Sequence, residues 1–325
     1  MAGYSGPGDR RMQPKMREYR PETDFVRVRD LLVDTRPYFI TAGNWDLVRW
    51  NYARHYVVPR LGTYKVAEPS TGAGLQAIRF WESTIGVWET ATGEIAGVVH
   101  SEAPRYGDAY VQRHPQWASL LDEMLEYAEA TLVDPESNAL KIYIQDHDQQ
   151  LQRVAQGRGY QKDVEDPGYD SEFVIDRLPP CGLPAGYAVQ SMAEGGDGER
   201  WRAVVGRGFD HLDPGEWPSP FAYQELQKAP DYRPSLDLHV ISSEGRYVSC
   251  CIVWYDARNR TGCFEPVGTD PEYRRRGLGR EVVMEGLRRI AGLGAETATV
   301  GSGLPFYQAI GFRIKYVGHY WIKNG

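Results

Sequence analysis

Residues Val267 to Arg280 read V-G-T-D-P-E-Y-R-R-R-G-L-G-R, and they join an expected strand directly to an expected helix. The first N–H groups of a helix have no intrahelical acceptor and carry about half a positive charge. Gly277 and Gly279 lack side chains, so an anion can approach the backbone closely. Further charge and donors come from arginine side chains: Arg274, Arg275, Arg276 and Arg280. The stretch predicts a cradle for a diphosphate.

The stretch could also be a Walker A loop or a solvated charge run. A Walker A loop is excluded because the chain contains no G-x-x-x-x-G-K-[ST]. The consecutive arginines could form a solvated charge run on a tight turn. The strand before them, the R-x-x-G-x-G spacing and the helix directly after them favour the cradle.

Length and composition limit the classes of protein. The chain has 325 residues, which suits two domains, and a net charge of −7, which argues against a general nucleic-acid binder. No apolar run is long enough for a transmembrane helix. Residues 1–14 contain no apolar core of a signal peptide and are expected to form a disordered tail. The 4 cysteines include no C-x-x-C pair, so we expect a reducing, cytoplasmic location and no metal site.

The chain reads as two halves with the same order of elements. A segment rich in proline and glycine, 179–186, is expected to be a linker between domains at 15–178 and 187–325. In the second half, strands are expected at 187–192, 236–242, 247–256, 263–269, 296–302 and 312–323. Helices are expected there at 198–209, 221–229, 278–291 and 304–312.

The first half shows a similar succession of elements. Strands are expected at 16–19, 79–90, 93–102, 141–146 and 172–176. Helices are expected at 25–32, 45–56, 120–128 and 149–156. The fold class is therefore α+β, with one mixed, mostly antiparallel sheet flanked by helices used twice.

The opening stretch resembles the acyl-CoA-binding motif of the GNAT superfamily of N-acetyltransferases, (Q/R)-x-x-G-x-(G/A). F-Y-Q-A-I-G-F at 306–312 is similar to the tyrosine and G-F helix stop of that family. The resemblance covers the second half strongly and the first half weakly, as in tandem GNAT proteins. It implies acetyl-CoA as the acyl donor.

The resemblance also implies roles for particular residues. Arg274, Gly277 and Gly279 match the diphosphate loop, in which backbone N–H groups from Arg275 through Leu278 to Arg280 would bind coenzyme A. The strand Val267, Gly268 and Thr269 would pair with the pantetheine arm. Pro266 supports this pairing, because proline is tolerated where a strand ladder is already broken.

Two residues are candidates for the chemistry of acetyl transfer. Glu265 lies two residues before Val267, so strand alternation places both side chains on one face, and Glu265 is a candidate general base. Tyr307 matches the family's tyrosine beside the thioester sulfur and is a candidate general acid, since a phenol stays protonated at neutral pH. The alternatives are a cross-strand ion pair for Glu265 and a core tyrosine for Tyr307.

The loop after 209 is a candidate acceptor site. It contains carboxylates and aromatic rings that would suit a cationic amine, although an ordinary acidic surface loop is the alternative. The candidate residues are Asp210, His211, Asp213, Glu216, Trp217 and Tyr223.

The first half lacks the cradle. No glycine occurs between Gly107 and Gly157, and the counterpart of Tyr307 is Leu151 or Val154. We therefore expect a degenerate first domain that supports the second. The predicted function is acetyl transfer to the primary amine of a small molecule, directly within a ternary complex. Alternatives are a mycothiol-synthase-like acetylation of an amino sugar conjugate and a non-catalytic acyl-CoA sensor. We expect a monomer or homodimer without nucleic-acid or membrane partners.

Overall fold

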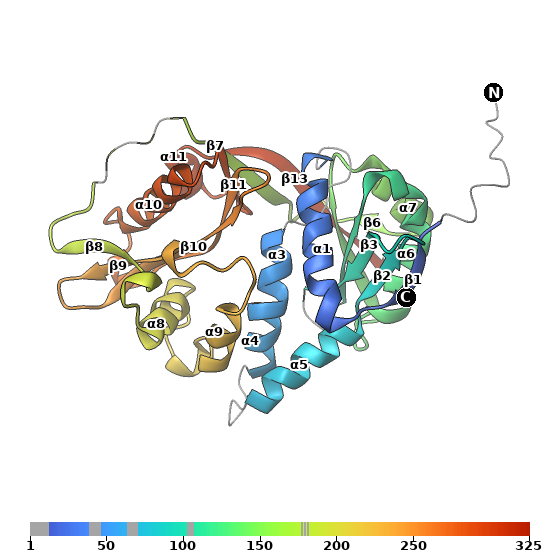
Figure 1. Cartoon of the computed structure of the whole chain (residues 1–325), viewed down its shortest axis with the longest axis horizontal. Helices are drawn as coiled ribbons and strands as arrows, with labels where there is room; N and C mark the ends of the chain where they lie inside the picture. Colours follow the sequence, from blue (N-terminus) through green and yellow to red (C-terminus); the bar gives the residue numbers. More distant parts are fainter. Residues whose placement is uncertain are drawn as a thin grey trace. The chain divides into compact units, whose positions relative to one another are not determined.

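The computed structural model describes residues 13–38, 47–63, 71–102, 107–176, 178, 180 and 182–325. Most of the expected tail at 1–14 lies outside these residues, as do Cys181 and one further residue of the expected linker. The chain forms two compact units (Figure 1). The first contains Met1–Asp46, Arg79–Pro167 and Gly318–Gly325, and the second contains Leu47–Ile78 and Gly168–Val317. Each unit therefore draws on both halves of the sequence.

The first unit has a mixed sheet. Its strands run in the order β1 (Lys15–Glu18), β2 (Gly86–Glu89), β3 (Ile95–His100), β4 (Asp108–Arg113), β5 (Ala139–Gln145) and the end of β13 (Arg313–Asn324). Only β4 and β5 are parallel among these neighbours. The short β6 (Gln161–Lys162) also pairs with β13. The sheet packs against α1 (Pro21–Thr35), α6 (Leu121–Thr131) and α7 (Gln149–Gly157).

The second unit repeats this pattern. Its strands run in the order β8 (Tyr187–Ser191), β9 (Asp237–Ser242), β10 (Tyr247–Asp256), β11 (Thr261–Thr269), β12 (Thr297–Val300) and β7 (Gly168–Val174). Only β11 and β12 are parallel, in the place that β4 and β5 hold in the first unit. The expected fold, a mixed and mostly antiparallel sheet flanked by helices and used twice, is confirmed.

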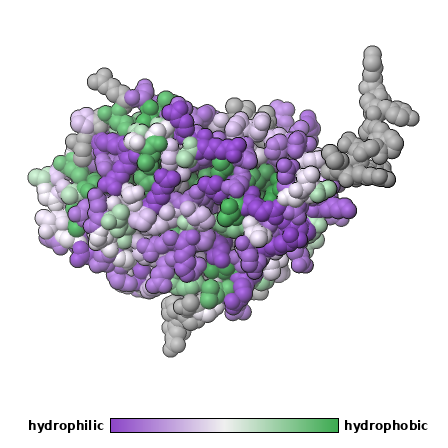
Figure 2. All heavy atoms as spheres, in the orientation of Figure 1, coloured by the Kyte–Doolittle hydropathy of each residue, from purple (hydrophilic) through white to green (hydrophobic). Residues whose placement is uncertain are grey.

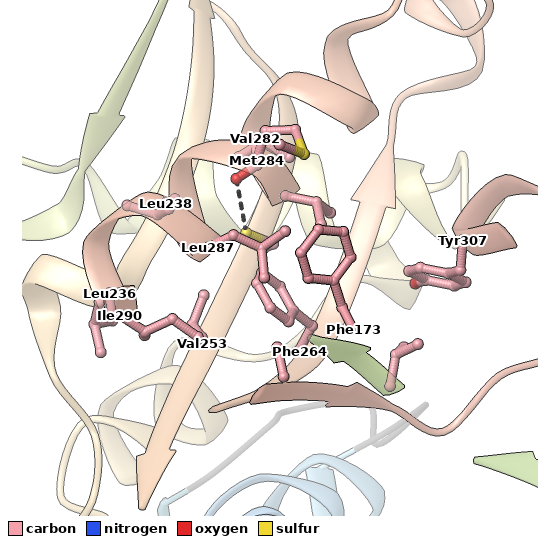
Figure 3. Packing of buried hydrophobic residues seen from close by; sticks show 14 of the residues in the cluster. Phe173, Leu236, Leu238, Val253, Phe264, Val282, Met284, Leu287, Ile290 and Tyr307 are labelled. Carbon is pink, nitrogen blue, oxygen red and sulfur yellow. Dashed lines mark hydrogen bonds between the residues drawn. The ribbon is translucent and has the colours of Figure 1, made fainter. Parts of the chain in front are cut away.

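Helices cover both faces of the second sheet (Figure 1). α10 (Leu278–Gly292) packs on one face, and α8 (Gly198–Gly208) packs on the other beside α9 (Pro220–Leu226). The apolar stripe predicted for α10 is fully buried in the core: Leu278, Val282, Val283, Leu287 and Ile290. The same segment of α10 meets Phe264 of β11 and Phe173 of β7 in this core (Figure 3).

Helices from the first half of the sequence also belong to the second unit. They are α3 (Leu47–Tyr52), a π-helical turn η3 (Ala53–Val57), α4 (Val58–Thr63) and the start of α5 (Thr71–Ser83). The strand expected at 79–90 is therefore wrong for residues 79–83, which continue α5. Ile78 and Trp81 are buried while Phe80 is exposed, and this three-residue spacing belongs to a helix.

The last strand of each half pairs in the sheet of the other unit. β7 ends the first half of the sequence and pairs antiparallel with β12 of the second unit. The end of β13, from Gly318 to Asn324, pairs antiparallel with β5 of the first unit. The expectation that 312–323 closes the second sheet is thus incomplete, because alternation along a strand identifies its faces and not its neighbours.

Hydrophilic side chains predominate on the face shown in Figure 2, with smaller hydrophobic groups between them. Among the described helices, none combines the length and the apolar composition needed to span a membrane.

His239 on β9 gives a stability test of the fold. The ring is fully buried and stacks on Tyr247 at 3.6 Å between centroids, and neither ring nitrogen has a hydrogen-bond partner among the residues that the structure describes. Burial lowers the pKa of His239 to about 4, against an ordinary value of 6.5. Between pH 4 and pH 6.5 the His239 ring binds a proton in the unfolded chain but not in the folded chain. His239 therefore destabilises the fold increasingly as pH falls from 6.5 to 4.

We expect His239→Phe to remove this pH dependence while keeping the stacked ring. The free energy of unfolding of the variant, relative to the wild type, should rise by up to about 3 kcal/mol between pH 7 and pH 4. Urea unfolding at a series of pH values measures this difference. A difference that stays constant across the range would show that His239 is not held neutral.

Candidate functional site

The parallel ladder between β11 and β12 stops early. Its paired residues end at Cys263 and Thr299, whereas β11 continues to Thr269. On its other side β11 stays paired with β10 up to Ser249 opposite Thr269. Beyond Cys263, one edge of β11 therefore has no pairing with β12. This is the broken ladder expected at Pro266.

A bulge in β11 lies at the point where the strands part. Val253 pairs with Phe264 and Cys251 pairs with Val267, so Glu265 and Pro266 together stand opposite the single residue Ile252. The Trp254 indole N–H donates to the Glu265 carbonyl oxygen at 2.7 Å and holds the bulge. The extra residue interrupts the alternation that predicted one face for Glu265 and Val267. Val267 packs against the core under α10 instead.

The turn between β11 and α10 exposes the helix N-terminus. Gly277 adopts a positive φ of 80°, and a Cβ atom there would meet no atom within 4 Å. The helix has no side-chain cap, so its first N–H groups keep no partner from a capping residue. Gly279 lies close to Thr269 and Phe306, since a Cβ atom on it would come within 2.9 Å of the Thr269 hydroxyl. The two glycines thus keep the backbone of the turn bare, as predicted.

Three of the four arginines make contacts within the protein. Arg274 donates to the backbone oxygens of Thr269 and Gly208 at 3.0 and 3.2 Å and pairs with Asp210 at 2.8 Å. Arg276 donates to the Tyr187 hydroxyl at 3.0 Å, and Arg280 pairs with Glu281. Arg275 is exposed and makes no hydrogen bond or ion pair within the described part of the chain. The arginine side chains therefore mainly stabilise the conformation of the turn, and fewer of them are available to contact a ligand.

Asp270 anchors the start of the turn. Its carboxylate is buried, accepts from Arg207 Nε at 2.6 Å and from the Glu272 backbone N–H at 3.0 Å, and lies 3.4 Å from Arg246. Although burial alone would raise it, these donors lower the pKa of Asp270 below its ordinary value. The residue ties α8 and β10 to the turn.

Glu265 forms an ion pair with Arg49 of α3. Both side chains are partly exposed, at 28% for Arg49 and 23% for Glu265. The predicted base is therefore held by a residue from the first half of the sequence. The role of Arg49 was not predictable from the sequence, because no local pattern connects residues so far apart in the chain.

Two tyrosines follow Arg49 on the same helical segment. Tyr52 and Tyr56 are buried and stack at 4.6 Å between ring centroids. Burial, reinforced by Tyr56 and Glu265, raises the pKa of Tyr52 well above its ordinary value. Tyr52 comes directly before the π-helical turn Ala53–Val57, and Tyr56 lies within it. Such turns are often found at functional sites.

Tyr307 lies at the margin of the core cluster, on α11 (Pro305–Ile310) (Figure 3). Burial raises the pKa of its phenol well above the ordinary value, with the Cys251 and Glu265 groups adding to the effect. The hydroxyl makes no hydrogen bond to any residue that the structure describes. A neutral phenol without an internal acceptor is able to donate a proton to a bound group.

The predicted acceptor loop does not present its carboxylates together. Asp210 pairs with Arg274, Asp213 accepts from the Gly215 N–H at 2.9 Å, and Glu216 lies 3.6 Å from His211. The two aromatic residues are packed inward. Trp217 lies against Gly206 and donates to the His211 carbonyl, and Tyr223 stacks on Trp201 at 4.2 Å. Binding of an acceptor amine by this loop stays a prediction.

A salt bridge lies at the equivalent place in the first unit. Arg113 at the end of β4 pairs with Asp148 at 2.9 Å, and both side chains are buried. Asp148 also caps α7, which corresponds in order to α11. The turn after β4 starts with His114 and Pro115 rather than glycine. Of the two expected counterparts of Tyr307, Leu151 is buried and Val154 is half-buried.

Among the described residues, no group of three or more His, Cys, Asp or Glu side chains is arranged to hold a metal ion. Cys250, Cys251 and Cys263 are buried.

Part of the chain matches a known protein family, and the fold is similar to solved structures. Residues 234–314 match the family model described as acetyltransferase (GNAT) domain. A GCN5-related N-acetyltransferase from Sphaerobacter thermophilus is similar in structure, with a TM-score of 0.56, 19% identity and coverage of 84% of this chain and 93% of that one. A tandem GNAT protein from the clavulanic acid biosynthesis pathway has a TM-score of 0.54 and 14% identity, covering 87% and 96%. No curated protein matches the sequence.

The anchoring role of Asp270 can be measured. We expect Asp270→Asn to lower the free energy of unfolding by about 2–3 kcal/mol, because two arginines lose their buried carboxylate partner. Urea unfolding measures the loss. Glu272→Gln is the matched control, since Glu272 contacts the same arginines but is 62% exposed and should cost less than about 0.5 kcal/mol. Equal losses in the two variants would contradict the anchoring role.

Proposed function

We propose that the chain, whose residues 234–314 match the model of an acetyltransferase (GNAT) domain, transfers an acetyl group from acetyl-CoA to the primary amine of a small molecule. The transfer is direct, within a ternary complex, and the active site lies in the second unit. The observation that supports this most strongly is the pairing of two features at one place. The bare helix N-terminus at Gly277 follows directly from the strand β11, whose edge has lost its partner.

These two features fit the two parts of coenzyme A. Backbone N–H groups from Arg275 to Arg280 would bind the diphosphate, helped by the partial positive charge of the helix N-terminus. The edge of β11 at Val267, Gly268 and Thr269 would pair with the amide groups of the pantetheine arm, as an added strand does. The arginines mostly hold the turn in shape, and Arg275 is the one that makes no hydrogen bond or ion pair with the residues described.

Acetyl-CoA supplies an activated acetyl group, and the residues of the chain move the protons. The amine nitrogen forms a bond to the thioester carbonyl carbon as the carbon–sulfur bond breaks. Glu265 accepts the proton that the amine loses, directly or through water. Tyr307 donates a proton to the departing thiolate, because its raised pKa keeps the phenol protonated at neutral pH.

Alignment of the two substrates should contribute more than either proton transfer. Well-oriented reactants reach effective molarities of about 10⁵–10⁸ M, whereas a general base contributes about 10²–10⁴-fold. The binding of the donor along β11 and α10 therefore matters more to the rate than any single side chain.

Binding of the donor can be tested at Gly277. We expect the wild-type chain to bind one acetyl-CoA per chain in isothermal titration, because the first unit lacks the glycine turn. Gly277→Glu should abolish this binding by placing a carboxylate where the diphosphate would lie. Gly292→Glu is the control, since Gly292 ends the same helix and a Cβ atom there also meets nothing within 4 Å. Two bound acetyl-CoA per chain, or equal loss in both variants, would contradict the assignment.

The role of Glu265 is testable by kinetics. We expect Glu265→Gln to lower kcat by about 10²-fold or more at neutral pH without abolishing turnover, because alignment is retained. Release of free thiol from acetyl-CoA measures the rate. Wild-type kinetics for the variant across the whole pH range would show that Glu265 is not the base.

A further inference from the structure

One side of the helical segment 47–63 carries two arginines and two tyrosines. Arg49, Tyr52, Tyr56 and Arg60 follow each other at helical spacing. Arg49 contacts Glu265, and Arg60 lies 3.3 Å from the His211 ring nitrogen Nε2. This side of the segment, which we call the arginine–tyrosine face, therefore extends from the proposed base to the start of the loop after α8.

Arg49 places a positive charge beside the proposed base. Two unit charges 4 Å apart interact by about 4 kcal/mol at the effective dielectric constant typical of a protein surface. An ammonium group that approaches Glu265 would be repelled by the Arg49 guanidinium. A substrate that carries an anionic group beside its amine meets an attractive partner for each of its charges instead. The opposite charges of Arg49 and Glu265 thus complement a zwitterion better than a simple amine.

Three other carboxylates of the second unit also have partners within the protein. Glu225 pairs with Arg54 and Lys228, and Asp231 accepts from the Asn51 amide at 2.8 Å. Asp237 is fully buried and accepts from the Tyr232 hydroxyl at 2.8 Å and the Trp201 indole at 3.0 Å. Glu265 is the partly exposed carboxylate that lies next to the unpaired edge of β11. The acceptor amine is therefore drawn to the position where Arg49 is also present.

We propose, building on the function proposed above, that the acceptor is an amine bearing a carboxylate within a few bonds, as in an amino acid. Arg49 binds the carboxylate through its planar guanidinium, and Glu265 receives the amine. When the carboxylate of the acceptor binds, it replaces Glu265 as the partner of Arg49. Glu265 is then available to the amine. The first half of the sequence thus supplies a residue that determines the specificity of a site built by the second.

The experiment compares acceptors that share one amine. The full-length protein is assayed for thiol release from acetyl-CoA with a series of amino acids, with the corresponding amino acid amides, and with amines of the same side chain that lack the carboxylate. We expect kcat/KM to be about ten- to a hundredfold higher for the acid than for the amide. Arg49→Gln should reduce this ratio towards one, mainly through KM, and leave acetyl-CoA binding unchanged. Arg49→Lys should restore only part of the preference, because an ammonium cannot bind a carboxylate in the same planar geometry.

Arg54→Gln is the matched control on the same helical segment, since Arg54 pairs with Glu225 instead of Glu265. It should keep the preference for the acid. Equal kcat/KM for acid, amide and simple amine in the wild type would overturn the inference and leave the proposed function intact. This comparison needs no variant, so it decides the question even if Arg49→Gln fails to fold. Binding of acetyl-CoA without thiol release on any acceptor would overturn both.

Discussion

The early end of one parallel ladder is the constraint on which the site depends. β11 and β12 stop pairing at Cys263 and Thr299, and a bulge at Glu265 and Pro266 bends β11 at that point. An edge strand inside a sheet leaves backbone donors and acceptors that a ligand can use. The same strand leads through the turn anchored by Asp270 to the bare N-terminus of α10. Strand edge and helix end are thus joined by a short, fixed piece of chain.

The first unit shows what the same topology becomes without the glycine turn, since its own parallel ladder also ends early, at Ala109 and Ile142. Its parallel pair β4 and β5 occupies the equivalent place in the sheet, and its turn contains no glycine. The buried pair of Arg113 and Asp148 connects the end of β4 to the start of α7. Separating the two buried charges would lose their Coulomb attraction. The ion pair therefore holds the end of β4 to the start of α7 within the unit. The same topology therefore gives a different strand end in each unit, because the local side chains differ.

Much of the fold and part of the site follow from the sequence. The stripe of α10, the glycine turn and the hairpin of β9 and β10 are local patterns, and all three are present in the structure. Long-range relations were not predictable. The exchange of β7 and β13 depends on which strands meet, and the ion pair of Arg49 with Glu265 joins two residues far apart in the chain. The face of Glu265 was mispredicted because Pro266 indicated a broken ladder but not the extra residue that interrupts the alternation.

The exchanged strands also bear on how such a chain could arise and change. β7 belongs to the sheet of the second unit, and the end of β13 belongs to the sheet of the first. If the chain were divided at the proline-rich connection, each fragment would contain one strand that pairs in the sheet of the other unit. Each fragment would also lack one strand of its own sheet. Neither repeat can then be lost, duplicated or recombined on its own. A repeat that no longer bound a ligand would still be retained, because the other repeat needs its strand to complete a sheet. Divergence of the two copies, rather than deletion of one, is the course that this interlocked topology permits.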